Sequence, residues 1–354
     1  MRPTRRGAYG ARMSAAKLGW AAAQERGNPF WSGVALLLVQ RLGWRFGRGL
    51  LWPITAWFLA TSPEARAASR EYLGLALGRT ARLTDVARHI HAFAASILDA
   101  AFFLSGRTQD FTVEVTGQHY LDELAARGRG CILLGGHLGG FEVLRHVGRS
   151  SPVPVRPLMY RNNAPGMIAL LDRLDPDLTK AIIPLGEPDS MLRAREAIER
   201  GEIIGILADR AVAGDRHVTV PFLGRDAGFP TGPIIVAAVL GAPVLVVRGV
   251  CTGPRRYEVR FDPFADRIVL RRQHRAEDLR EVVMRFARTL EAGCLAHPTQ
   301  WFNFYPFWKP STDAAHDVPA GDLAGPAVGG PRPGHGLGGA VHLGPPGPQP
   351  GSRA

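Results

Sequence analysis

The sequence predicts an α/β fold, in which a mixed, mostly parallel sheet is covered by helices and preceded by an N-terminal helical segment associated with a membrane. The α/β part is indicated by short β-branched runs that alternate with helical stretches after residue 106. The N-terminal segment is indicated by an excess of basic residues beside Trp and Leu within the first 60 positions.

The composition is that of a globular protein. Of 354 residues, 46% are hydrophobic and 21% are charged, which excludes a wholly disordered or collagen-like chain. The three cysteines, Cys131, Cys251 and Cys294, are widely spaced. They exclude a disulfide framework and a CxxC metal or redox pair, so a reducing compartment is expected. Residues 318–354 hold 11 Gly and 8 Pro in 37 positions and are expected to form a disordered tail.

Positive charge is concentrated at the N-terminus. Residues 1–48 carry nine Lys or Arg against one Glu, a net charge of +8 out of +12 for the chain. Arg41, Arg45 and Arg48 fall on one stripe of a helix, and the largely apolar segment 49–60 follows with two tryptophans. This combination favours the surface of an anionic bilayer, so residues 1–60 are predicted to anchor the protein to a membrane. The alternative is a helix packed on the core with its arginines in solvent.

The membrane interpretation does not require a transmembrane helix. No stretch of 18 or more residues is both apolar and free of charge, and the N-terminus lacks the pattern of a cleavable signal peptide. A cytoplasmic location is therefore expected. Nucleic-acid binding is not expected, because basic and aromatic residues do not interleave beyond the N-terminal arm.

Two helices are expected before the first strand. The sequence Ser-Pro-Glu at 62–64 gives an N-cap, a first-turn proline and a favourable acid, and predicts a helix that ends near residue 77. A second helix is expected over 84–106. His89 and His91 lie on it two positions apart, on different faces, and are expected to be packing or surface residues rather than ligands.

Strands and helices alternate along the remainder of the domain, which is predicted to span 61–317. The expected strands are 111–115, 131–134, 153–160, 181–185, 202–209, 242–250 and 256–261. The expected helices are 119–128, one that begins near residue 140, 165–173, 190–201, 231–242 and 277–296. In such sheets ligands bind at the carboxyl ends of the strands, so the loops that follow strands are where chemistry is expected.

The most informative loop is Gly-Gly-His-Leu-Gly-Gly-Phe-Glu at 135–142. His137 and Glu142 would lie about 140° apart on one continuous helix and could not touch, so they can meet only if His137 precedes the helix. The glycines permit that turn. Glu142 would then lie in the first turn and accept a hydrogen bond from one imidazole nitrogen, leaving the other as a base. The alternative is a capped strand-to-helix turn with an incidental histidine.

Other polar residues follow neighbouring strands. Arg161 and Asn163 come after the strand at 153–160, and Asp209 and Arg210 come at the end of the strand at 202–209. A sheet would deliver these groups to the same edge. An aromatic run at 300–308 closes the folded part.

Taken in this order, the motifs resemble those of the bacterial late lipid A biosynthesis acyltransferases, within the lysophospholipid acyltransferase superfamily. The likeness runs from about residue 30 to 310. It implies that His137 and Glu142 are the catalytic pair, with His137 as the base and Glu142 orienting its imidazole. It also implies that Arg161, Asn163, Asp209 and Arg210 bind substrate, with Arg161 holding a phosphate or stabilising negative charge.

The resemblance implies partners as well. The acyl donor would be a thioester of acyl carrier protein or coenzyme A, and the acceptor a lipid or glycolipid at an anionic membrane surface, on the cytoplasmic face of the bacterial inner membrane. The ending at 303–308 departs from the usual lipid A pattern, so the acceptor can be lipid A-like or another lipid. No cofactor and no metal ion is expected.

Two alternatives stay open at this point. A non-enzymatic membrane-surface scaffold would need no catalytic histidine. A hydrolase of acyl esters would need a nucleophile, but the sequence holds no Gly-x-Ser-x-Gly motif, and Cys131 lies inside a strand.

Overall fold

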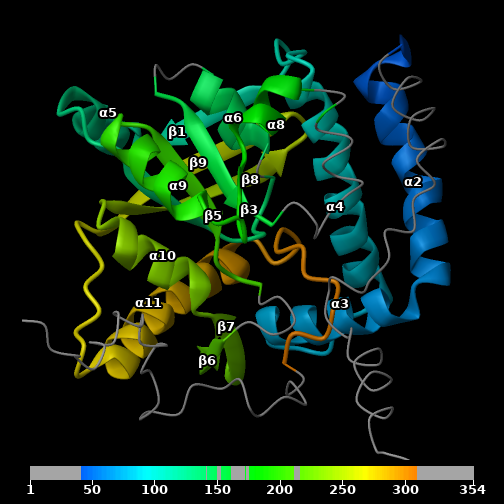
Figure 1. Ribbon diagram of the computed structural model, residues 1–354. Helices are drawn as coiled ribbons and strands as arrows, with labels where there is room; N and C mark the ends of the chain where they lie inside the picture. The colour runs from blue at the N-terminus through cyan, green and yellow to red at the C-terminus, as the bar shows by residue number, and fades with distance from the viewer. Residues whose placement is uncertain are drawn as a thin grey trace, which may run out of the picture. The chain divides into compact units, whose positions relative to one another are not determined.

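The computed structural model describes residues 41–140, 142–149, 153–160, 172, 175–210 and 216–308 (Figure 1). Residues 1–40 of the predicted anchor, the tail at 318–354 and all but residue 172 of the helix expected at 165–173 lie outside the described residues.

The main sheet is mixed and mostly parallel, as predicted. Its strands follow the order β1-β9-β8-β2-β5-β3-β4. All neighbours are parallel except β8 and β9, so β1 and β9 run opposite to the others. The strands are β1 (Thr112–Thr116), β2 (Cys131–Gly135), β3 (Val155–Met159), β4 (Ile183–Pro184), β5 (Ile203–Leu207), β8 (Val244–Gly253) and β9 (Arg256–Ala265).

Helices cover both faces of this sheet, as the handedness of the crossovers requires. The connection from β2 to β3 moves across the sheet in one direction, whereas those from β4 to β5 and from β5 to β8 move back. Right-handed crossovers therefore place α6 on one face and α9 and α10 on the other. The described helices of this part are α5 (Gln118–Ala126), α6 (Glu142–Arg149), α8 (Pro176–Ala181), α9 (Ser190–Glu199), α10 (Gly232–Leu240) and α11 (Arg275–Ala296).

The core on the α6 face is built from alternate residues of neighbouring strands. Cys131 and Leu133 point to the same side of β2 because side chains alternate along a strand, and both are buried there. Leu121 of α5 and Val143 of α6 pack against this layer, together with Phe103 from the preceding helix. The helices therefore hold the start of α6, and with it Glu142, close to the sheet.

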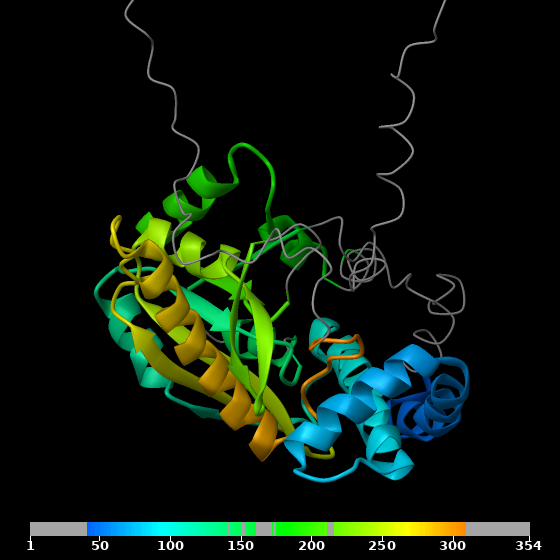
Figure 2. The same cartoon turned by 90° about the horizontal axis from the view of Figure 1, so that it is seen from below.

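Among the described residues, three helices precede the sheet: α2 (Trp44–Thr61), α3 (Pro63–Ala76) and α4 (Leu83–Leu104). The predictions for α3 and α4 are confirmed to within two residues. α2 packs along α4 through Leu51, Ala95, Leu98 and Phe102, and the two lie side by side in Figures 1 and 2. Among the described helices, none combines the length and the apolar character needed to cross a bilayer.

One pair of strands was not predicted. β6 (His217–Phe222) and β7 (Arg225–Pro230) form an antiparallel hairpin beside α11. Its two turn residues, Leu223 and Gly224, have φ angles of 52° and 76°. Two consecutive positive φ angles suit the right-handed twist of a tight hairpin, but leucine is uncommon there, so the sequence carries no standard turn signal.

Candidate active site

The pairing of β2 with β5 brings two of the predicted site residues together. The strands are parallel neighbours, and Gly135 at the end of β2 lies opposite Leu207 at the end of β5. His137 and Asp209 each follow two residues later. Their meeting at the carboxyl edge of the sheet is therefore a direct consequence of strand register.

His137 and Asp209 form a close pair. The imidazole Nδ1 lies 2.7 Å from Asp209 Oδ1, and the backbone N–H of His137 donates to Oδ2 over 2.8 Å. The Asp209 side chain is fully buried, whereas that of His137 is 28% exposed. A carboxylate only accepts hydrogen bonds, so this contact assigns the ring proton to Nδ1 and leaves the lone pair of Nε2 available as a base.

Trp301 is the third member of this group. Its indole Nε1 donates to Asp209 Oδ2 over 2.9 Å, and its side chain is almost fully buried. The segment around Trp301 also holds the loop, because the Phe302 N–H donates to the His137 carbonyl and the Gly139 N–H donates to the Gln300 carbonyl. Both oxygens of Asp209 are thus bonded, and the histidine backbone is fixed from two sides.

A buried histidine supports Trp301 from behind. His89 is completely buried, with Nδ1 2.8 Å from the Ser69 hydroxyl and Nε2 2.9 Å from the Trp301 carbonyl oxygen. It stacks on Phe304 with a centroid distance of 4.5 Å. The prediction that His89 is a packing residue is consistent with this environment.

Arg210 places a positive charge near the pair. Its Nη2 donates to the Phe302 carbonyl, and its guanidinium lies 5.8 Å from the centre of the Tyr305 ring. This charge lowers the pKa of the imidazole and helps to keep Asp209 ionised. Arg210 therefore lies close to the His137–Asp209 pair, and its role in binding substrate stays a prediction.

Glu142 is not hydrogen-bonded to His137 in the part of the chain that the structure describes. It begins α6, as expected, but among the described residues the imidazole bonds to Asp209 and no hydrogen bond joins it to Glu142. The reason is the path of the loop. Gly139 pairs with Gly249 of β8, on the side of β2 opposite to β5, and this leads the chain toward β9 before α6 starts.

Glu142 instead lies beside Tyr257 of β9. A Cβ placed on Gly140 would lie 3.7 Å from Glu142 Oε2 and 3.9 Å from Tyr257 Cε1, so the two side chains flank this glycine. Burial raises the pKa of the Glu142 carboxyl. We expected Glu142 to accept the hydrogen bond from the imidazole, but Asp209 is the acceptor. A catalytic role of Glu142 stays a prediction.

Burial and charge act in opposite directions on the pair. Burial and the charge of Arg210 lower the pKa of His137, and Asp209 only partly offsets them. Burial alone would raise the pKa of Asp209, but the charges of His137 and Arg210 and the hydrogen bonds from His137 hold it well below its usual range. The result is an ionised carboxylate beside an imidazole that is neutral near pH 7.

The two remaining predicted residues, Arg161 and Asn163, lie outside the described residues. They follow β3, which neighbours β5 in the sheet. Among the described side chains no group of three or more His, Cys, Asp or Glu is arranged to hold a metal ion.

Sequence reasoning missed Trp301 and Tyr257 as neighbours of the site. The aromatic run at 300–308 was recognised, but nothing in it distinguishes a tryptophan that bonds a carboxylate from one that fills the core. Tyr257 lies on a strand whose pairing partners cannot be read from the sequence. For both residues, the sequence carries only a weak signal of a place in the site.

Comparison of the amino-acid sequence with known protein families gives a match. The family model of bacterial lipid A biosynthesis acyltransferases matches residues 80–310. His137, Glu142, Asp209, Arg210 and Trp301 all fall within the matched segment. A search of curated proteins found no match.

Proposed function

The chain belongs to the bacterial lipid A biosynthesis acyltransferase family, and from this we propose that it transfers a fatty acyl group from a thioester to a hydroxyl group of a lipid. The observation that carries the proposal is the His137–Asp209 pair at the carboxyl edge of the sheet, with Nε2 left free to accept a proton.

The reaction begins with proton removal. His137 Nε2 takes the proton of the acceptor hydroxyl as its oxygen adds to the thioester carbonyl carbon. The imidazolium that forms is stabilised by the Asp209 carboxylate, which holds Nδ1–H at 2.7 Å. The positive charge of Arg210 favours the negative charge that develops on the carbonyl oxygen.

The tetrahedral intermediate then collapses. The carbon–sulfur bond breaks, the thiol of the carrier leaves with the proton returned by His137, and the acyl group remains on the acceptor oxygen as an ester. No covalent acyl-enzyme is needed. The nearest cysteine in sequence, Cys131, is buried within β2, and burial raises the pKa of its thiol to about 12, which makes it a poor nucleophile.

We further propose that the donor is an acyl carrier protein or coenzyme A thioester, and that the acceptor is a lipid A-like or other lipid at the cytoplasmic face of the inner membrane. The support for a membrane setting is the exposed apolar surface of α2, where Trp52 is 64% and Trp57 is 53% exposed. Arg41 and Arg45 are exposed at the start of the same region. Basic residues beside exposed aromatic side chains bind the headgroup boundary of anionic bilayers.

Mass spectrometry of lipids tests the proposal. Purified full-length protein is incubated with acyl carrier protein bearing a labelled acyl chain and with bacterial membrane lipids, beside the His137→Ala variant. We expect one lipid class to gain the mass of the acyl group only with the wild-type protein. Release of free labelled acid without any acylated lipid would instead indicate a hydrolase, and equal products from His137→Ala would contradict the proposed base.

A further inference from the structure

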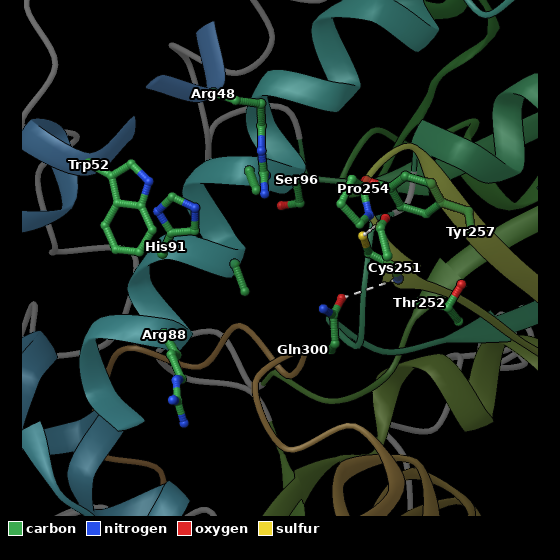
Figure 3. A pocket seen from close by; sticks show the side chains of 13 residues that line it. Arg48, Trp52, Arg88, His91, Ser96, Cys251, Thr252, Pro254, Tyr257 and Gln300 are labelled. Atoms are coloured by element: carbon green, nitrogen blue, oxygen red, sulfur yellow. Dashed lines mark hydrogen bonds between the residues drawn. The ribbon is translucent and has the colours of Figure 1, made fainter. Parts of the chain in front are cut away.

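A pocket of about 280 Å³ lies between the N-terminal helices and the turn that joins β8 to β9 (Figure 3). α2 contributes Arg48 and Trp52, one turn apart on the same face. One face of α4 contributes Arg88 and His91. Gln300 closes the side nearest the loop between β2 and α6 that carries His137 (the catalytic loop). The volume is near the lower end for small-molecule sites, so it suits a head group rather than a whole lipid.

The pocket is positively charged. Its described lining holds two arginines and no carboxylate. The two nearby carboxylates that interact with these arginines are already bonded to other donors. Asp99 accepts from the Trp44 indole Nε1 over 2.6 Å and from the Tyr257 hydroxyl over 2.8 Å. Asp85 accepts from the Arg79 guanidinium over 2.8 and 3.2 Å.

Neither Arg48 nor Arg88 forms an ion pair with a carboxylate in the part of the chain that the structure describes. The Arg48 guanidinium rests 5.3 Å from the centre of the Trp44 ring. Arginines that line a pocket without a carboxylate partner are suited to bind an anionic oxygen group of a ligand, because the guanidinium presents several N–H donors in a fixed plane.

One side of the pocket is aromatic and opens toward the exposed face of α2. Trp52 stacks on His91 with a centroid distance of 4.4 Å and an interplanar angle of 25°. In Figure 3 this pair faces Cys251 and Gln300 across the pocket. A ligand with an anionic group and an apolar part would find both chemistries here, because Trp52 is exposed beside the arginines.

The pocket adjoins the catalytic loop. The carbonyl oxygen of Gln300 accepts from the Gly139 N–H over 2.8 Å, and Tyr257, another lining residue, lies close to Gly140 and Glu142. Arg48 and Trp52 precede residues 80–310, so membership of the family does not imply this pocket.

We propose that this pocket binds the phosphate-bearing head group of an anionic lipid, with Arg48 and Arg88 as its phosphate contacts and the Trp52–His91 pair beside its apolar part. The role of that lipid as the acyl acceptor rests on the proposed function. Its binding does not.

Binding of a monomeric lipid tests the pocket without a membrane. Calorimetric titration of the full-length protein uses dihexanoylphosphatidylglycerol below its micelle concentration, and dihexanoylphosphatidylcholine as a ligand with the same chains and no net charge. We expect the phosphatidylglycerol to bind at least about tenfold more tightly, because both lipids offer the same phosphate but the two arginines repel the quaternary ammonium of phosphatidylcholine. Equal binding of the two lipids would overturn the proposal.

Variants locate the binding. Arg48→Gln/Arg88→Gln should weaken phosphatidylglycerol binding by about tenfold or more, and Arg48→Lys/Arg88→Lys should retain part of it. The matched control, Arg70→Gln/Arg272→Gln, removes the same charge from exposed positions outside the pocket and should bind like the wild type. Melting temperatures close to that of the wild type establish that the variants fold. A folded Arg48→Gln/Arg88→Gln protein that binds within twofold of the wild type would overturn the proposal.

Inorganic phosphate distinguishes a lipid site from a free phosphate site. It should displace the lipid only at concentrations at least about tenfold higher than the lipid itself, because it lacks the part that contacts Trp52. Equally effective competition would overturn the lipid assignment. If phosphatidylglycerol binding depends on both arginines but the wild-type protein transfers no acyl group, the proposed function is wrong and the assignment of the pocket is supported. If the wild-type protein transfers an acyl group but the Arg48→Gln/Arg88→Gln protein still binds phosphatidylglycerol normally, the pocket assignment is wrong and the proposed function is unaffected.

Discussion

The pKa of the His137 imidazole is set by neighbours that act in opposite directions. Burial and the charge of Arg210 disfavour the imidazolium, whereas Asp209 favours it. Because the first two effects prevail, the pKa of the imidazole falls below its ordinary 6.5. The carboxylate then matters most when the ring becomes charged during the reaction, since Nδ1–H already points at Asp209.

The pH dependence of kcat/KM follows from this balance. A base must be deprotonated to act, so activity should fall on the acid side, with its midpoint below pH 6.5. Arg210→Gln removes a positive charge that lowers the pKa of His137. Its acid limb should therefore move to higher pH, as measured by initial rates between about pH 4 and pH 8.

Arg272→Gln provides the control for that profile. Arg272 is exposed and is not among the groups that shift the pKa of His137, so its substitution should leave the acid limb in place. An Arg210→Gln profile that coincides with the wild-type profile, or moves to lower pH, would contradict the assignment of His137 as the titrating base.

At the scale of elements, the loop between β2 and α6 is fixed by backbone contacts on both sides. The Gly139 and Gly140 positions lie against Gly249 of β8, and the Gly140 N–H donates to the Gly249 carbonyl. Gly139 has a φ of 81°, and a Cβ there would lie 1.9 Å from the Gly249 oxygen. The loop can follow this path only because position 139 lacks a side chain.

Gly139→Ala should therefore destabilise the protein and displace His137. The left-handed conformation alone costs about 1–2 kcal/mol for alanine, and the backbone clash brings the expected total to about 4 kcal/mol or more. Chemical denaturation measures the loss of unfolding free energy. Gly224→Ala is the matched control, because Gly224 has a similar φ of 76° with no atom within 4 Å of its Cβ position. Equal losses of unfolding free energy in the two variants would contradict the prediction, because they would mean that the contact with the Gly249 oxygen adds nothing.

The elements themselves were largely predictable, whereas their pairing was not. Helix signals at 62–64 and 84–85 placed α3 and α4 to within two residues, because caps and first-turn residues act locally. The hairpin β6–β7 was missed because Leu223 occupies a φ that leucine rarely adopts. The neighbours of β2 depend on contacts between distant segments, which leave no local signal.

The same distinction explains the candidate site. His137 and Asp209 were both chosen from the sequence, since each follows a strand. Their direct pairing depends on the register of β2 against β5, and Trp301 joins them from a segment 92 positions beyond Asp209. Sequence reasoning paired His137 with Glu142 from their spacing along the chain and from the resemblance to the acyltransferase family, and neither gives the distance of His137 from Asp209 in the fold.

At the scale of the whole described structure, the site lies where the sheet meets the N-terminal helices. Trp44 of α2 bonds to Asp99 of α4, which in turn accepts from Tyr257 of β9. Exposed apolar side chains of α2 include Phe46, Trp57 and Phe58. If the proposed membrane contact is correct, it would lie on the helix that also lines the proposed lipid pocket with Arg48 and Trp52.

Replacing two of those side chains tests the proposed contact with a membrane surface. Trp57→Ser/Phe58→Ser should weaken binding to anionic vesicles, because each exposed aromatic side chain contributes apolar area to the headgroup boundary. Cosedimentation measures the bound fraction. Leu192→Ser/Val239→Ser removes comparably exposed side chains from α9 and α10 and should bind as the wild type does. If both double variants lose binding equally, or neither does, α2 is not the docking surface.

The central claim is that Asp209, rather than Glu142, holds the imidazole of His137. It is tested most directly by the acyl-transfer rates of Asp209→Asn and Glu142→Gln, measured with the same donor and acceptor in proteins of equal melting temperature. Asparagine cannot stabilise the imidazolium and can present an amide donor to Nδ1, so Asp209→Asn should lose about 10²–10⁴ in kcat. Glu142→Gln should lose no more than about tenfold, since it leaves the His137–Asp209 contact intact. A large loss in Glu142→Gln beside near-normal turnover in Asp209→Asn would contradict the claim.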